Sequence, residues 1–114
     1  QMCIRDSWVY SRDVARAIAH VAEKRHLRQN VLNVGGPEVW SIEEWCRALK
    51  KRFSGFHYVI DPAAANVRYH ALQDNAVMDI TALRSAGEYC PAFGLEEALA
   101  DYCIWADRFG YLMT

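Results

Sequence analysis

Residues 30–44 read NVLNVGGPEVWSIEE, and this stretch decides the expected fold. The short apolar run Asn30–Val34 stops at Gly35-Gly36-Pro37, which is typical of a buried strand that enters a tight turn. Ser41 and Glu44 then form the pattern of a capping box, in which each side chain can bind the backbone N–H of the other residue. The stretch therefore predicts a strand, a turn and the start of a helix.

The helix that begins here has a second signal at its start. Trp40 and Trp45 occupy the two positions of a hydrophobic staple around the cap. An apolar stripe then runs from Ile42 to Phe53, so we expect the helix to continue to about Arg52.

An earlier helix is expected to begin beside Ser11, its candidate N-cap, and to run through Arg25. Asp13 stands in its first turn, where a carboxylate suits the positive helix end, and the cations at positions 24–28 suit the negative end. The same patterns predict strand residues at 8–10 and 56–60, a loop over 61–76, a short helix from Ile80 to about Ala86, and a last helix from Leu95 to about Phe109. Helices alternating with short strands indicate an α/β fold with three or four helices.

Length and charge exclude several classes of protein. A chain of 114 residues has room for one domain. Its formal net charge of −1 does not direct it toward nucleic acid or an anionic membrane surface, and no apolar run approaches the roughly 20 residues needed to span a bilayer. Residues 1–7 differ in character from the rest of the chain. We interpret them as a non-native or artefactual start with few tertiary contacts, and residues 8–114 as the domain.

Motifs for catalysis or metal binding are missing from the sequence. There is no glycine-rich phosphate turn, no nucleophile elbow and no His-Glu-x-x-His pattern, and the four histidines are scattered. The pairs Glu43-Glu44 and Glu96-Glu97 stand in first turns of helices, where acidic residues are expected. The four cysteines form no Cys-x-x-Cys pair, which argues against a disulfide framework or zinc site and fits a reducing cytoplasm. We therefore expect no catalytic, cofactor-binding or metal-binding residue in this chain.

Three stretches, which together span about residues 8–109, carry a family resemblance. They are Tyr10–Ile18, the strand–turn–helix of residues 31–36 and 41–44, and Asp79–Leu83 with Pro91, Leu95 and Trp105. Their order and spacing resemble the C-terminal part of the NAD-dependent epimerase/dehydratase family, the extended short-chain dehydrogenases/reductases. The resemblance implies that the chain is the C-terminal, substrate-binding lobe of a Rossmann-type enzyme.

The same resemblance implies what the parent protein contains. Its N-terminal Rossmann domain, absent here, would bind NAD or NADP on a glycine-rich turn and carry a Tyr-x-x-x-Lys catalytic pair. Its substrate would be a nucleotide-sugar or a related small molecule, and a homodimer of the parent is left open. The present chain has neither feature, so it is expected to be a substrate-side fragment that is not catalytic alone.

Two residues are candidates for substrate binding through this resemblance. Family members often place an arginine against the substrate phosphates ten or eleven residues before the late aspartate, and Arg68 stands eleven before Asp79. A guanidinium can clamp a pyrophosphate with two hydrogen bonds, although a solvated loop arginine explains Arg68 equally well. Tyr10 is the second candidate, with packing in the core as the favoured alternative. A further family arginine would fall at Asp6, and this departure leaves the substrate class open.

Two other functions compete with the enzyme fragment. One is a stand-alone small α/β binding or interaction module without catalysis. The other is a family member that senses a dinucleotide without turning it over. The reading frame upstream of residue 8 separates these hypotheses, because a glycine-rich strand–turn–helix and a Tyr-x-x-x-Lys pair there would indicate the enzyme.

Overall fold

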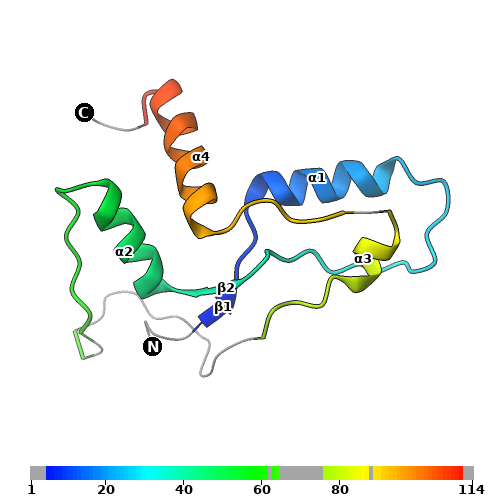
Figure 1. The fold of residues 1–114 in the computed structure, drawn as a ribbon, viewed down its shortest axis with the longest axis horizontal. Helices are drawn as coiled ribbons and strands as arrows, with labels where there is room; N and C mark the ends of the chain where they lie inside the picture. The colour runs from blue at the N-terminus through cyan, green and yellow to red at the C-terminus, as the bar shows by residue number, and fades with distance from the viewer. Residues whose placement is uncertain (1–4, 62, 65–75, 88, 112–114) are drawn as a thin grey trace.

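The computed structural model describes residues 5–61, 63–64, 76–87 and 89–111 (Figure 1). Within this part of the chain the elements are β1 (Arg5–Ser7), α1 (Ser11–Ala22), β2 (Val39–Ser41), α2 (Ile42–Arg52), α3 (Thr81–Ser85) and α4 (Leu95–Arg108). The architecture is α-rich, with four helices and a small two-stranded sheet among the described residues. The α/β expectation is confirmed at this coarse level.

The sheet does not lie where the sequence predicted it. β1 pairs antiparallel with β2, with Arg5 opposite Ser41 and Ser7 opposite Val39. The expectation that the first seven residues stay apart from the fold is therefore wrong for Arg5–Ser7, while the origin of that start stays a prediction.

The expected strands at 8–10, 30–34 and 56–60 are irregular segments instead. A strand is stable only where another strand takes up its backbone groups, and no described strand lies beside these segments. Trp8 is joined to the Gly35-Gly36 turn by one bond, from Gly36 N–H to the Trp8 carbonyl (3.1 Å). Asn33 is held through its side chain, since its Nδ2 donates to the carbonyl of Asp79 (3.1 Å).

The start of α2 agrees closely with its sequence signals. The Glu44 N–H donates to Ser41 Oγ (3.1 Å) and the Ser41 N–H donates to Glu44 Oε2 (2.7 Å), which completes the capping box. The Trp40 and Trp45 rings pack edge to face with centroids 5.8 Å apart, as a hydrophobic staple requires. The bounds of α2 match the prediction, and those of α3 and α4 match within about one residue. α1 ends at Ala22, three residues earlier than expected.

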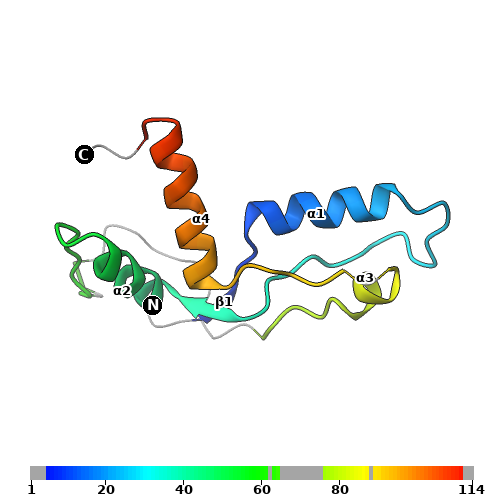
Figure 2. The same ribbon diagram turned by 45° about the horizontal axis from the view of Figure 1, so that its top comes forward.

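Most of the buried apolar side chains in the described part of the chain form two separate clusters. One lies between α1 and α3 and contains Ala17, Ile80, Leu83 and Tyr89, and the other lies between α2 and α4 and contains Ala48, Leu99 and Cys103. In both views α3 lies beside the C-terminal half of α1, and α2 lies at the opposite end of the molecule (Figure 1 and Figure 2). The fold therefore has two small cores rather than one central core.

The shape is open for a chain of this length. The Cα radius of gyration is 16.8 Å and the principal extents are 49 × 37 × 18 Å, whereas a compact domain of 100 residues has a radius of gyration of about 13 Å. Large apolar side chains remain exposed, including those of Ile18, Val31, Val59 and Ile104. Within the described residues, no helix is both long and apolar enough to cross a membrane.

The capping box gives a first prediction. Ser41→Ala removes the acceptor for the Glu44 N–H, so we expect the free energy of unfolding to fall by about 1 kcal/mol. Glu44→Ala should cost less, because the N–H that it binds is only partly buried. Urea denaturation of the two variants in parallel measures both effects. Equal and negligible changes would contradict the role of the capping box.

Candidate functional site

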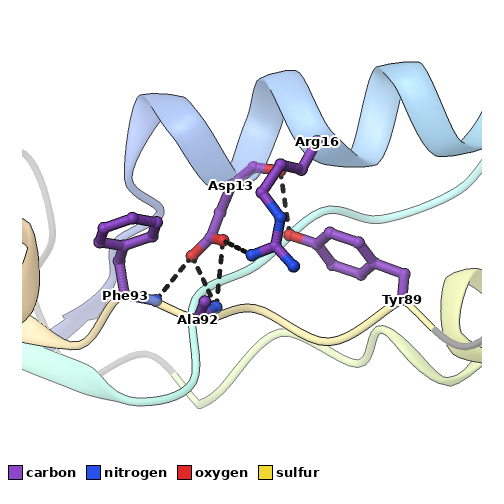
Figure 3. A network of polar contacts seen from close by, with 5 residues as sticks. All are labelled: Asp13, Arg16, Tyr89, Ala92 and Phe93. Carbon is purple, nitrogen blue, oxygen red and sulfur yellow. Dashed lines mark hydrogen bonds and ion pairs between the residues drawn. The ribbon is translucent and has the colours of Figure 1, made fainter.

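The candidate site is built around a buried carboxylate at the start of α1. Asp13 has no exposed surface, and its carboxylate accepts hydrogen bonds from the backbone N–H groups of Ala92 (3.0 and 3.1 Å) and Phe93 (3.0 Å). Arg16 Nη1 donates to the same carboxylate (3.0 Å), and the Tyr89 hydroxyl donates to the carbonyl of Asp13 (3.1 Å) (Figure 3). These contacts fasten α1 to the segment that leads into α4. We call them the Asp13 junction.

The role of Asp13 differs from the one that its sequence position predicted. Asp13 was expected to complement the helix dipole, and Ser11 to be the N-cap. In the structure Tyr10 is the N-cap, no side chain caps the helix, and Ser11 is its exposed first residue. One signal was available, because Asp13 lies four residues before the buried Ala17 and therefore on the same face of α1.

Tyr10 lies at the edge of the junction and is tied to α4. Its hydroxyl donates to Asp101 Oδ2 (2.8 Å), and its ring packs on Phe93 with centroids 5.0 Å apart. Burial, followed by the hydrogen bond and the negative charge of Asp101, raises the pKa of Tyr10 to about 12. Tyr10 is therefore a protonated donor at neutral pH and cannot act as a base there.

Arg12 completes the contacts around Asp101. Its guanidinium forms an ion pair with the Asp101 carboxylate and lies over the Phe93 ring, 5.5 Å from the centroid. Between α1 and the segment before α4, an open hollow of about 610 Å³ is lined by Arg12, Ala15, Arg16, Ala19, Ala92 and Phe93. Both arginines already contact carboxylates, so this surface offers planar donors and an aromatic face but no group positioned for proton transfer.

The glycine pair offers no place for the phosphates of a dinucleotide. A Cβ atom on Gly36 would overlap the carbonyl oxygen of Trp8, and one on Gly35 would lie 2.9 Å from Met78 Cβ. The Gly36 N–H is already bonded to Trp8. These glycines serve close packing of the backbone and leave no room for a phosphate, so the pair does not fit a cofactor. The described residues also contain no cluster of three or more side chains suited to a metal ion.

The remaining candidates lie elsewhere or outside the described residues. Arg68, the other candidate for substrate binding, falls outside them. His20 on α1 is half-buried, with its ring 6.5 Å from that of Tyr89 and no hydrogen-bond partner for Nε2 among the described residues. Cys46, Cys90 and Cys103 are free thiols.

Comparison of the chain with protein-family models, with curated proteins and with solved structures gave no match. The family resemblance therefore rests on the residues and their spacing alone.

The Asp13 junction predicts a large effect of a small change. Asp13→Asn keeps the shape of the side chain but turns an NH₂ group toward one of its donors, so we expect a loss of about 2–3 kcal/mol in the free energy of unfolding. Asp107→Asn, at an exposed position of α4, is the matched control and should change stability by less than about 0.5 kcal/mol. Urea denaturation compares the two, and equal effects would show that the junction contributes little.

The Tyr10–Asp101 bond predicts a dependence on alkaline pH. Because the pKa of Tyr10 is raised to about 12 in the folded chain, its stabilising effect is complete below pH 10 and is lost as the pH rises through 12. Tyr10→Phe should lower the free energy of unfolding by about 1 kcal/mol at pH 8 and by less at pH 11. Tyr102→Phe, at an exposed position, is the control. A Tyr10→Phe effect that stays constant between the two pH values would contradict the assignment.

Proposed function

We propose that this chain is the C-terminal, substrate-binding lobe of an NAD(P)-dependent epimerase/dehydratase or reductase of the extended short-chain dehydrogenase/reductase family. It acts on a nucleotide-sugar or related small molecule only together with a Rossmann cofactor domain. The observation that carries the proposal is that residues in or beside the three stretches that resemble the family are hydrogen-bonded to one another.

The first and third stretches meet at the Asp13 junction. Asp13 belongs to the stretch Tyr10–Ile18, and its carboxylate binds the two residues that directly follow Pro91. Tyr10 itself reaches Asp101 on α4, the helix that contains Leu95 and Trp105. A resemblance that arose only from helical composition would not select the residues that join two distant segments.

The second stretch contacts the third directly and is joined to the first through the neighbouring Trp8. Trp8, just before the first stretch, accepts a hydrogen bond from Gly36 N–H and donates its indole N–H to the carbonyl of Trp40 (3.0 Å). Asn33 donates to the carbonyl of Asp79, the first residue of the third stretch. The pattern is that expected of residues that share one fold, and it supports the family assignment.

The open shape supports a role beside another domain. Aromatic side chains of α4 and the residues after it stack on one another while remaining about half exposed or more, among them Tyr102, Trp105, Phe109 and Tyr111. Exposed apolar surface of this extent is typical of an interaction surface. In this proposal the Rossmann domain covers part of it. The free thiols of the described cysteines are in line with a reducing, cytoplasmic setting.

A stand-alone binding or interaction module is the second candidate. It is favoured by the two small cores and the Asp13 junction, because these contacts form within this chain without help from another domain. The two candidates differ in what the upstream reading frame encodes.

Cofactor binding tests the proposal. NADH titrated into the purified chain should give no saturable fluorescence change in the micromolar range, because dinucleotide binding in a Rossmann domain needs backbone N–H groups at a glycine-rich turn. The chain extended upstream by its natural reading frame should bind NADH and contain a Tyr-x-x-x-Lys pair. Micromolar binding by the chain alone would contradict the proposal. An in-frame start codon next to residue 8 would favour the module instead.

A further inference from the structure

We propose that a second cavity, at the C-terminal end of α1, binds a small phosphorylated sugar or polyol. The cavity has a volume of about 550 Å³, within the usual range for small-molecule sites. One wall is the segment that follows α1, and the other is formed by Asp79 and α3. The cavity lies past the C-terminal end of α1, whereas Asp13 stands in the first turn of that helix.

Basic side chains line the first wall. Arg28 and His26 both border the cavity, and Lys24 and Arg25 precede them in the sequence. The dipole of α1 was the expected explanation for these cations, but that effect fades within the last helical turn. Since α1 ends at Ala22, Arg28 lies six residues beyond the helix and needs another explanation. A guanidinium presents paired N–H donors that match a phosphate.

Hydroxyl-binding groups line the second wall. Asp79 Oδ1 accepts a hydrogen bond from the Thr81 N–H (2.9 Å), and Asn33 holds the carbonyl of Asp79. The hydrogen bonds from Thr81 lower the pKa of Asp79, so this carboxylate stays charged and can accept hydrogen bonds from sugar hydroxyls. Thr81 and Ser85 both line the cavity and stand four residues apart, on one face of α3.

The chemical groups on the two walls together indicate the class of ligand. Asp79 is the only carboxylate among the described residues that line the cavity, and it faces a wall that contains Arg28 and His26. A neutral sugar would leave the Arg28 guanidinium without an anionic partner. Inorganic phosphate has no sugar hydroxyl to donate to the Asp79 lone pairs that Thr81 leaves free. Leu32 and Ala82 supply apolar surface for the carbon face of a sugar. A phosphate ester of a hydroxylated carbon chain satisfies all three kinds of group.

Ribose 5-phosphate is a suitable probe, and inorganic phosphate and ribose are titrated separately for comparison. Titrated into the ¹⁵N-labelled chain, it should shift amide resonances of residues 26–32 and 79–86 in a saturable way. We expect ribose 5-phosphate to bind at least about tenfold more tightly than inorganic phosphate or ribose, a difference of about 1.4 kcal/mol in binding free energy. Arg28→Gln should weaken binding about tenfold or more, whereas Arg25→Gln, at a neighbouring exposed position that does not line the cavity, should change it less than about twofold.

A second variant separates the sugar contact from the phosphate contact. Asp79→Asn keeps an oxygen for the Thr81 N–H, so the fold should be preserved. It should weaken ribose 5-phosphate binding several-fold while leaving inorganic phosphate binding unchanged or tighter.

Absence of saturable shifts at these residues would overturn the proposal. Equal affinity for ribose 5-phosphate and inorganic phosphate would overturn the assignment of a sugar to the cavity. Equal losses of ribose 5-phosphate affinity in Arg25→Gln and Arg28→Gln would indicate a diffuse charge effect and would overturn the proposed binding site. The outcome is independent of NADH binding, so it can fail or succeed apart from the proposed function.

Discussion

The buried charge of Asp13 is the constraint on which the rest of this structure depends. An ionised carboxylate without contact to water is stable only when its oxygens are fully hydrogen-bonded. Here the donors are Arg16 on the same helix and the backbone N–H groups of Ala92 and Phe93. Two of these donors are backbone groups far along the chain, so the charge is satisfied only when the segment before α4 has reached its native position.

That requirement couples the two small cores. The segment held by Asp13 begins at Tyr89, which is part of the core between α1 and α3, and ends at the start of α4, which forms the other core with α2. Neither core buries many large side chains, so in a chain with an open shape each core by itself would stabilise the fold only weakly. The polar junction supplies the geometric connection that a single apolar core supplies in a more compact domain.

The sequence predicts the local parts of this fold and misses the long-range ones. The capping box at Ser41 and the helix of residues 42–52 are encoded within four to twelve residues, so their patterns are readable without knowledge of the fold. The pairing of Arg5–Ser7 with Val39–Ser41 depends on residues more than thirty positions apart, and neither strand has a strong pattern of its own. Asp13 was misread for a related reason. Its position in a first helical turn has an adequate local explanation, and only the fold brings Ala92 and Phe93 to it.

The same distinction bears on which surfaces are free to bind a ligand. Tyr10 was one of two candidates for substrate binding, with core packing as the favoured alternative, and its hydroxyl and the Arg12 guanidinium both contact Asp101. A ligand that used the Tyr10 hydroxyl would have to replace a hydrogen bond to a charged partner, which typically contributes about 1.5–3 kcal/mol. A ligand that used Arg12 would have to break its exposed ion pair with Asp101. Arg28 has no ion pair within the described part of the chain, and it borders a cavity rather than a helix junction. A ligand phosphate would therefore gain a guanidinium contact there without breaking one, and this difference favours the end of α1, rather than its start, as the place where an anion binds.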